Sequence, residues 1–526
     1  MSTLRFPATI RVFVAFCAFS SLLCAQTAPA LRALPQPAPH VEATGIEGPQ
    51  SPSTSRFLKM TTAIGDDYFD GRDSRGRVRR HLNIARKAGV SYLRFGFSWN
   101  GVEPAQGEYR FEFWDMLVEE AGRAGIQLMP YIAYTPEWAA RSEQDFWKQP
   151  PKDPALYTTI VRKLVERYRG KIRIWELWNE PDNLEYWTGT ADEFAATMIP
   201  AALAAREVAP ETTLVLGGLT QGPGEFFQKL IRDHQIERYF DVLALHAYPE
   251  SWHELRAETV FQQVLPEMQR VAQQSGRPVW LNEMGYADYR FAPNKASLYG
   301  TSAYYNYEHT QRYAADFLFK SYTMTLASGA PMAGWYRIDD FVESDPRMPS
   351  DKVHHHLGVT DIRGKPKPAF YALKFFNTLF ASPTRVVCSP QGPALCATQE
   401  DSVTPASDVA PAARRLSRGR PALAATETSQ STVNIFQRKD STLILTGWLR
   451  SSNHNEVASH TGMEQDRRRE RINIQLPCTA HTVRTFDALG KQLSTRRLNS
   501  STLPDVILTG DRVFIAKVTC RPATRP

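Results

Sequence analysis

The chain has 526 residues, of which 42% are hydrophobic and 22% are charged, and its formal net charge is +7. This length exceeds one ordinary domain, so we expect one large domain and at least one smaller one. The positive charges are spread along the chain rather than clustered, which argues against a nucleic-acid-binding protein.

The first 25 residues have the order of a secretory signal peptide. Arg5 and Arg11 precede an apolar stretch over residues 12–23, and the small residue Ala25 follows Cys24. We predict cleavage after Ala25 and a secreted or periplasmic protein, with a lipid anchor at Cys24 as the less favoured alternative. No other stretch approaches the roughly 20 apolar residues that a membrane span needs, so no membrane span is predicted.

Residues 26–55 are rich in Pro, Ala, Ser and Thr and predict a disordered leader. From residue 56 to about 382, short β-rich runs alternate with amphipathic helical patterns. Eight runs have the composition of buried strands: 58–64, 92–97, 127–133, 172–178, 213–217, 242–246, 279–281 and 332–338. Helical patterns between them include 113–124, 157–168, 194–208 and 312–327.

These eight units predict an α/β fold, specifically a (β/α)8 TIM barrel over residues 56–382, because such barrels have eight parallel strands and span about 250 residues before insertions. Parallel strands that are buried on both faces are continuously apolar, as most of these runs are. The alternative is a doubly wound open sheet. It is disfavoured because no Gly-rich phosphate-binding turn follows the first run.

Residues 383–526 are predicted to form a C-terminal β-sandwich domain that packs against the barrel. Alternating β-type runs at 433–437, 442–448, 472–476, 482–486 and 513–518 are separated by turn signals. Residues 399–431 lack apolar periodicity and predict a disordered insertion. This sandwich has no evident row of exposed aromatic residues, so we expect structural support rather than an independent sugar-binding module.

Four cysteines remain after the predicted leader is removed: Cys388, Cys396, Cys478 and Cys520. An even number of cysteines in an exported protein favours disulfides, and four cysteines allow three pairings. We favour Cys388 with Cys396 and Cys478 with Cys520. The histidine run at 354–356 has no regular spacing or carboxylate partner, so no metal site is predicted.

Two of the predicted strands end in Asn-Glu. The run over 172–178 is followed by Asn179 and Glu180, and the run over 279–281 is followed by Asn282 and Glu283. In a (β/α)8 barrel the carboxyl ends of the strands meet at one rim, where catalytic residues lie. Two glutamates at one rim are what retaining glycoside hydrolysis requires, since one carboxyl protonates the leaving oxygen and the other attacks the anomeric carbon.

Indole rings also follow predicted strands, which suits a carbohydrate site because sugar faces are apolar and stack on flat rings. The candidates for such platforms are Trp99, Trp138 and Trp335, and the alternative for each is packing in a loop or core.

The segment 178–182, Trp-Asn-Glu-Pro-Asp, resembles the acid/base motif of the clan A glycoside hydrolases, and within the clan it is most similar to family 39, the β-xylosidase and α-L-iduronidase relatives. The likeness covers roughly residues 57–380. It is supported by Trp-Asn-Gly-Val-Glu-Pro at 99–104, Leu-His-Ala-Tyr-Pro at 245–249, Trp-Leu-Asn-Glu-Met-Gly at 280–285 and Lys-Pro-Lys-Pro-Ala-Phe-Tyr at 365–371.

The resemblance implies that Glu180 is the general acid and later the base, and that Glu283 is the nucleophile. Asn179 is expected to hydrogen-bond the sugar 2-hydroxyl. Glu180 is expected to have the higher pKa of the two glutamates, driven up by the charge on Glu283.

Three further roles are implied around the nucleophile. His246 and Tyr248 are expected to flank it and hold its orientation, and Arg94 is expected to help keep it ionised. The sequence thus predicts a secreted retaining glycosidase of a poly- or oligosaccharide that needs no cofactor. The competing hypothesis is a catalytically silent carbohydrate-binding barrel. The sugar, the choice between internal and terminal cleavage, and the oligomeric state do not follow from the sequence.

Overall fold

The computed structural model describes residues 56–68, 71, 73–249, 257–288, 310–342, 355–390, 395–396, 398–400, 431–450 and 468–521. The predicted signal peptide and leader, and nearly all of the predicted insertion, lie outside the described residues. The chain divides into two compact units, residues 1–40 and 41–526, and everything described belongs to the second. Within the described residues, no helix has the length and apolar character required to cross a membrane.

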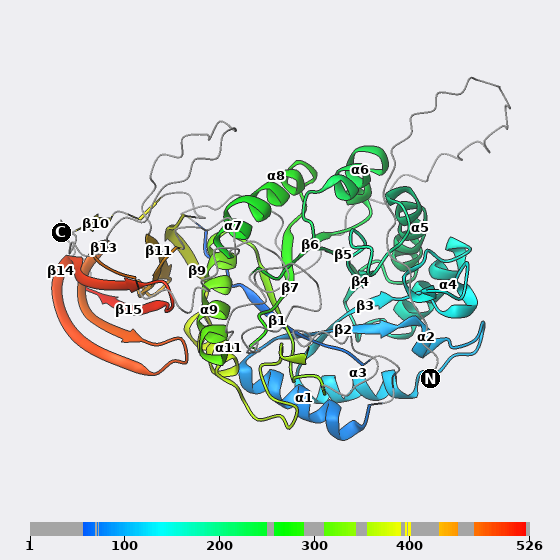
Figure 1. Ribbon diagram of the computed structural model, residues 1–526, viewed down its shortest axis with the longest axis horizontal. Helices are drawn as coiled ribbons and strands as arrows, with labels where there is room; N and C mark the ends of the chain where they lie inside the picture. Colours follow the sequence, from blue (N-terminus) through cyan, green and yellow to red (C-terminus); the bar gives the residue numbers. More distant parts are fainter. Residues whose placement is uncertain are drawn as a thin grey trace, which may run out of the picture. The chain divides into compact units, whose positions relative to one another are not determined.

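Eight parallel strands close into a barrel in sequence order, and β8 pairs with β1 (Figure 1). The strands are β1 Thr61–Asp66, β2 Tyr92–Ser98, β3 Gln127–Ala133, β4 Ile174–Leu177, β5 Thr213–Leu219, β6 Val242–Ala247, β7 Val279–Met284 and β8 Met332–Tyr336. The predicted α/β class and (β/α)8 barrel are confirmed. Each predicted strand overlaps its observed counterpart and differs from it only at the ends.

Helices surround this barrel (Figure 1). They are α1 Arg75–Ala88, α2 Trp99–Val102, α3 Glu112–Ala124, α4 Pro154–Arg167, α5 Ala191–Val208, α6 Glu225–His234, α7 Ala257–Thr259, α8 Leu265–Ser275, α9 Gln311–Ala327 and α11 Pro368–Leu379, with a π-helical turn Val260–Val264 between α7 and α8 and 3-10 turns Glu137–Ala139, Phe146–Lys148 and Ile236–Arg238. Local signals set their ends. At the start of α5, the Thr190 hydroxyl accepts from the Glu193 amide at 3.2 Å, and the Glu193 carboxylate accepts from the Thr190 amide at 2.8 Å.

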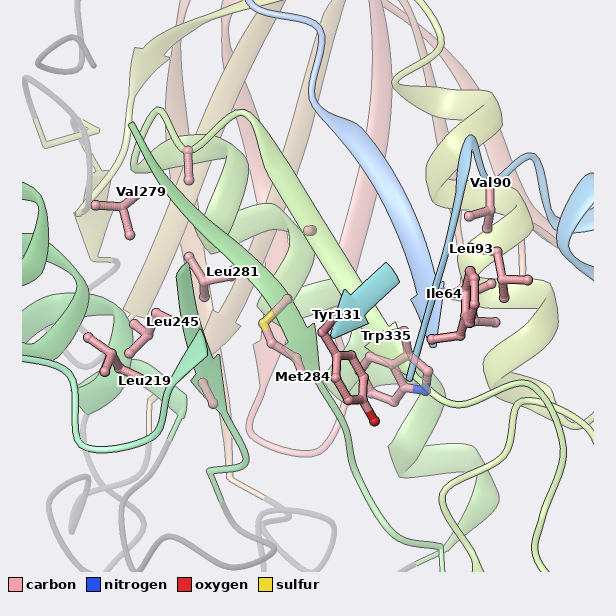
Figure 2. Close-up of a cluster of buried hydrophobic side chains, with 14 of the residues drawn as sticks. Ile64, Val90, Leu93, Tyr131, Leu219, Leu245, Val279, Leu281, Met284 and Trp335 are labelled. Atoms are coloured by element: carbon pink, nitrogen blue, oxygen red, sulfur yellow. The ribbon is translucent and has the colours of Figure 1, made fainter. Parts of the chain in front are cut away.

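Alternate residues of the barrel strands face two different cores. In β4, Ile174 belongs to the inner cluster that fills the barrel, whereas Trp175 and Leu177 belong to the outer cluster between strands and helices. Figure 2 shows Leu281, Leu245 and Trp335 in this outer cluster. Both faces of each strand are therefore apolar along most of its length, and polar inner residues gather near the carboxyl ends.

The C-terminal region forms one antiparallel sheet in the order β10-β13-β15-β12-β11-β9, with β14 paired to β13. Its strands are β9 Thr384–Cys388, β10 Thr398–Glu400, β11 Ser431–Arg438, β12 Leu443–Leu449, β13 Arg469–Phe486, β14 Gln492–Thr509 and β15 Phe514–Cys520. The predicted C-terminal β domain is thereby confirmed.

Two details of this sheet differ from the sequence prediction. The runs predicted separately at 472–476 and 482–486 are one strand, β13, whose pairing with β14 shifts register between Gln475 and Ala480, around Pro477. Strands β9, β10 and β14 were not predicted, and β10 overlaps the start of the predicted insertion. In β14 half of the side chains are exposed and no long apolar alternation is present.

Both favoured disulfides are present. Cys388 pairs with Cys396, and Cys478 of β13 pairs with Cys520 of β15, at Cα separations of 5.0 Å and 5.9 Å. The first bond closes a short loop after β9, and the second joins neighbouring strands. Of the three pairings that four cysteines allow, the predicted one is confirmed.

Strand β12 joins the sheet to the barrel, because its two faces belong to different cores. Leu443 and Leu445 pack within the sheet's own cluster, whereas Ile444 and Trp448 belong to the large cluster around the barrel. The Trp448 indole also donates to a carboxylate oxygen of Glu258 in α7 at 2.9 Å. These contacts favour a supporting role for the sheet.

We expect Trp448→Ala to lower the free energy of unfolding of the protein by about 3–5 kcal/mol, because it leaves a cavity in a shared core and a buried carboxylate without its donor. Denaturant unfolding followed by fluorescence and circular dichroism measures this. The matched control is Leu493→Ala on β14, where the side chain is 62% exposed and the expected change is within about 0.5 kcal/mol. Equal stability of the two variants would contradict a shared core.

Candidate active site

Polar side chains from four barrel strands and the segments that follow them meet at the carboxyl end of the barrel. Each is no more than 9% exposed: Arg94 of β2, Glu176 of β4, Asn179 and Glu180 after β4, His246 of β6, Tyr248 after β6 and Glu283 of β7. All the polar residues that the sequence predicted at this rim are brought together here. The three tryptophans are not all part of the group.

The backbone after β4 turns sharply and presents Glu180 to the group. Trp178 and Glu180 have positive φ angles of 73° and 48°, in the left-handed region that non-glycine residues rarely adopt. The Trp178 ring is fully buried and packs edge-to-face against Trp187, with ring centroids 5.0 Å apart. The Glu180 amide donates to the Gly218 carbonyl at 3.1 Å. Buried packing thus holds a backbone strain of the kind found at functional sites.

Arg94 is the centre of the network. Its Nε and Nη2 donate to the two carboxylate oxygens of Glu176 at 2.8 Å and 3.0 Å. Nη2 also donates to the Asn179 side-chain oxygen at 2.7 Å, and Nη1 donates to Glu283 Oε2. One guanidinium therefore fixes the positions of three neighbours, and its contact with Glu283 is the one that the sequence predicted.

Glu176 was not selected from the sequence, although it lies at the bottom of the same group. Besides the two bonds from Arg94, its carboxylate accepts from the Gly218 amide and from the Asn282 side chain, each at 2.9 Å. It is 0% exposed. The sequence did contain a signal for Glu176, since it lies within the apolar run Trp-Glu-Leu-Trp. A charged residue in a buried strand requires bonding partners and therefore indicates a polar site.

His246 and Tyr248 have different neighbours. The Tyr248 hydroxyl donates to Glu283 Oε1 at 2.5 Å, as predicted. His246 Nδ1 lies 2.7 Å from Glu180 Oε1 and 3.8 Å from Glu283 Oε1. His246 was predicted to orient Glu283, but it is hydrogen-bonded to Glu180. A single oxygen from each glutamate and a ring nitrogen of His246 lie within 4.8 Å of one another.

Gly218 makes room for this histidine. A Cβ atom at Gly218 would lie 2.0 Å from His246 Nε2, which no side chain could tolerate. The backbone of Gly218 also contacts Glu176 and Glu180. This glycine on β5 is therefore part of the site, and no sequence pattern that we considered indicated it.

The two glutamates have pKa values shifted in opposite directions. Burial raises the pKa of Glu180 above its ordinary value, the hydrogen bond and charge of His246 oppose that shift, and the charge of Glu283 adds to it. Burial also acts to raise the pKa of Glu283, but the charges of His246 and Arg94 and the hydrogen bond from Tyr248 outweigh it and hold the pKa below its ordinary value. The predicted order is confirmed. The charge of Glu283 contributes to the raised pKa of Glu180 as predicted, but burial, which was not predicted, contributes more.

Trp99 and Trp335 are packing residues in this structure. Trp99 is 0% exposed and lies edge-to-face with Trp138 at a centroid distance of 5.8 Å. Trp335 is 1% exposed and packs against Phe317 and Tyr322 of α9, in the outer cluster of Figure 2. Strand alternation explains this, since Trp335 faces the helices. Neither ring is placed to stack on a sugar, whereas the half-buried Trp138 stays a candidate.

A second aromatic group lies beside Asn179 and Glu180. Tyr134, Trp147 and Tyr186 are each half-buried, and the Tyr134 and Tyr186 rings stack with centroids 5.9 Å apart and an interplanar angle of 20°. Trp147 lies edge-to-face with Tyr134 at 5.4 Å, and the Asn179 side chain donates to the Tyr134 hydroxyl at 3.0 Å. These rings come from the loops after β3 and β4, which sequence periodicity does not place.

Two further groups of acidic and histidine side chains lie among the described residues. One comprises Asp66, His81 and Asp339, and the other comprises Asp288, Asp340 and His356. Both have cationic partners within the protein. Arg337 Nη2 lies 2.6 Å from Asp66, and Lys367 Nζ lies 2.8 Å from both Asp288 and Asp340. His354 of the histidine run lies outside the described residues.

Comparison with known sequences gives one family and distant relatives. The model of the glycosyl hydrolases family 39 matches residues 107–385. A β-xylosidase of Geobacillus stearothermophilus is 24% identical over 291 residues, which cover 52% of this chain and 56% of that protein. The β-galactosidase BbgII of Bifidobacterium bifidum is 27% identical over 122 residues, 19% of this chain and 18% of that protein. The matched part thus spans about half of the first relative and less of the second.

Comparison with solved structures gives the same architecture. A family 39 glycoside hydrolase from Bacteroides cellulosilyticus WH2 aligns with a TM-score of 0.60 at 15% identity, covering 88% of this chain and 81% of that one. A GH39 β-xylosidase from Caulobacter crescentus aligns with a TM-score of 0.54 at 14% identity, covering 89% of this chain and 97% of that one. At such identities these likenesses speak for the fold.

We expect His246→Asn to raise the pKa values of both Glu180 and Glu283, because His246 lowers both in the native site and its loss favours the protonated forms. NMR titration of the side-chain carboxyl carbons in 13C-glutamate-labelled protein measures this. The control is His481→Asn on the exposed face of β13, which should leave both values unchanged. A downward shift at either glutamate in His246→Asn would contradict the electrostatic role of His246.

Proposed function

The chain belongs to the glycosyl hydrolases of family 39, and from this membership and the geometry of the site we propose that it is a secreted retaining glycosidase of a poly- or oligosaccharide. Glu180 is the acid/base and Glu283 is the nucleophile. The observation that carries this proposal is the close approach of the two carboxylates, with oxygens within 4.8 Å, combined with their opposite pKa shifts. Retaining enzymes have carboxyl groups about 5–5.5 Å apart, whereas inverting enzymes need about 6.5–9.5 Å.

In the first step, Glu283 attacks the anomeric carbon while Glu180 protonates the leaving oxygen. The bond from that carbon to the leaving oxygen breaks, and a glycosyl ester of Glu283 forms. Tyr248 and Arg94 each donate to one oxygen of Glu283, which orients the carboxylate and keeps it ionised at the moment of attack. The raised pKa of Glu180 favours its protonated form, which is the form that donates to the leaving oxygen.

In the second step, Glu180 removes a proton from water, which attacks the anomeric carbon and releases Glu283. The electrostatics of the site assist this change of role. The charge on Glu283 raises the pKa of Glu180, and esterification removes that charge, so the pKa of Glu180 falls when a base is required. His246 Nδ1 lies 2.7 Å from Glu180 Oε1 and is therefore positioned to hold this carboxyl in both steps.

Asn179 is proposed to bind the 2-hydroxyl of the attacked sugar. Its side chain is already oriented from both ends, by the bond from Arg94 to its oxygen and by its own bond to the Tyr134 hydroxyl. The group of Tyr134, Trp147 and Tyr186 lies on the side of the acid/base, where the leaving group departs. We propose this group as the platform for the leaving sugar, replacing Trp99 and Trp335 in that role.

Export is part of the proposal. The two disulfides suit an oxidising compartment, and the signal peptide predicted at residues 1–25 would direct the chain there. The name of the Geobacillus relative makes an aryl β-xyloside the first substrate to test. A catalytically silent sugar-binding barrel is the remaining alternative, and the absence of turnover with bound sugar would favour it.

The two glutamates should differ when the leaving group is varied. Glu283→Ala should abolish hydrolysis of all glycosides, because no ester can form. Glu180→Ala should lose roughly 10²–10⁴-fold on substrates with poor leaving groups, but much less in the first step with 2,4-dinitrophenyl glycosides, which need no protonation. Stopped-flow release of dinitrophenol measures this, with the exposed Glu211→Ala as the control. Equal loss in both variants on the activated substrate would contradict these roles.

The first product should keep the anomeric configuration of the substrate, because two displacements at one carbon restore it. Proton NMR during the first minutes of hydrolysis, before mutarotation, distinguishes the two anomers. Immediate appearance of the opposite anomer would exclude double displacement.

A further inference from the structure

Asp67 is a further buried carboxylate near the active-site group, beyond Glu176, Glu180 and Glu283, and the proposed mechanism does not use it. It directly follows β1, and its side chain diverges from that of its neighbour Asp66. Asp66 binds Arg337 at 2.6 Å, whereas Asp67 accepts from the Tyr131 hydroxyl at 3.1 Å and from the Tyr336 hydroxyl. Asp67 is thus held between β3 and β8 at the carboxyl end of the barrel.

Asp67 is connected to Glu283 through two intervening side chains. It is 9% exposed, the same fraction as Glu283. The Tyr131 ring that holds Asp67 stacks on the Arg94 guanidinium, 4.6 Å from the ring centroid, and Arg94 in turn contacts Glu283. Burial raises the pKa of Asp67, the charge of Arg337 and the hydrogen bond from Tyr336 oppose that shift, and the charges of Asp66 and Glu283 add to it. These contacts place Asp67 nearer to Glu283 than to Glu180 in the network. The sugar that Glu283 attacks is expected to bind on this side of the site.

The hydrogen bonds of Asp67 leave acceptor capacity on its carboxylate. An ionised carboxylate offers about four lone-pair sites, and the two tyrosines occupy two of them. Sugar hydroxyls are the donors that suit the others, since a carboxylate can accept from two adjacent hydroxyls. A uronic acid would instead add a fourth carboxylate beside Asp67, Glu180 and Glu283. Among the described residues, the donors of Arg94 are already directed at Glu176, Asn179 and Glu283. Arg337, whose charge also acts on Asp67, is fully buried and bound to Asp66, so neither cation is available to a sugar carboxylate.

We propose that Asp67 selects the attacked sugar, accepting hydrogen bonds from its ring hydroxyls and restricting the site to neutral sugars rather than uronic acids. This inference rests on the proposed glycosidase function and adds a substrate class to it. The competing explanation is that Asp67 only ties Tyr131 of β3 to Tyr336 of β8.

The two explanations predict different substrate preferences for variants of the full chain. Only sugar selection by Asp67 predicts that its substitution changes the preference between neutral and uronide substrates. We expect the wild-type protein to hydrolyse at least one of the 4-nitrophenyl β-xyloside, β-glucoside and β-galactoside with a kcat/KM at least 100-fold above that for 4-nitrophenyl β-glucuronide. Asp67→Asn should lower kcat/KM for the neutral glycoside by roughly 10- to 100-fold, the loss typical of a charged hydrogen bond. It should also reduce the ratio of neutral to uronide activity at least tenfold.

Tyr131→Phe is the matched control, because it removes one tie to Asp67 but keeps the carboxylate. It should leave the ratio of neutral to uronide activity within about threefold of wild type, and thermal unfolding of each variant reports whether it is folded. If Asp67→Asn does not fold, Asp67→Ser replaces it, with the same expected loss of neutral-glycoside activity and the same change in the ratio. An unchanged ratio in the Asp67 variants, equal changes in Tyr131→Phe, or a wild-type preference for the uronide would overturn the proposal. A wild-type protein that hydrolyses no glycoside would overturn the proposed function as well.

Discussion

The buried pair of Arg94 and Glu176 is the interaction on which the site depends. Neither charge can be removed from water without full hydrogen bonding, because an unpaired buried ion costs several kcal/mol. Glu176 satisfies its carboxylate with bonds from Arg94, Gly218 and Asn282, and Arg94 directs its remaining donors at Asn179 and Glu283. Strands β2, β4, β5 and β7 are thereby connected below the reacting groups. The charge that makes this part of the barrel costly to bury is also what positions the nucleophile.

Within the same buried site, the pKa values of the two glutamates that are proposed to be catalytic shift in opposite directions. Both are removed from water, which by itself favours the neutral form of each. The charges of His246 and Arg94 and the hydrogen bond from Tyr248 hold the pKa of Glu283 below its ordinary value, whereas for Glu180 burial outweighs the hydrogen bond and charge of His246 and the pKa rises. The proposed nucleophile thus has more hydrogen-bond donors and positive charges around it than the proposed acid/base has. This difference separates the pKa values of the two carboxyls. Arg94 comes from β2 and Tyr248 from the segment after β6, and each donates to a different oxygen of Glu283.

The fold and the catalytic pair were predictable because their signals are local. Parallel strands buried on both faces give continuous apolar runs, and an Asn-Glu pair directly after such a run must reach the carboxyl rim. The direction of a side chain is not local in this sense. Trp335 lies near the carboxyl end of β8, yet strand alternation turns it toward α9. A predicted strand end at residue 64 hid the position of Asp67 directly after β1. Gly218 is essential only because His246 occupies the adjacent space, which is a contact between distant residues.

The C-terminal sheet illustrates a further consequence of alternation. Every strand has two faces, and in β12 one face closes the core of the sheet while the other contributes Ile444 and Trp448 to the core around the barrel. A shift of β12 by one residue would turn the side chains that face the barrel toward the sheet's own core, and the reverse. Its register is therefore strongly specified. The disulfide between Cys478 and Cys520 joins β13 to β15, the strand that pairs with β12. The register of β12 against the barrel is therefore constrained from within the sheet, which connects the disulfide between Cys478 and Cys520 to the stability of the barrel.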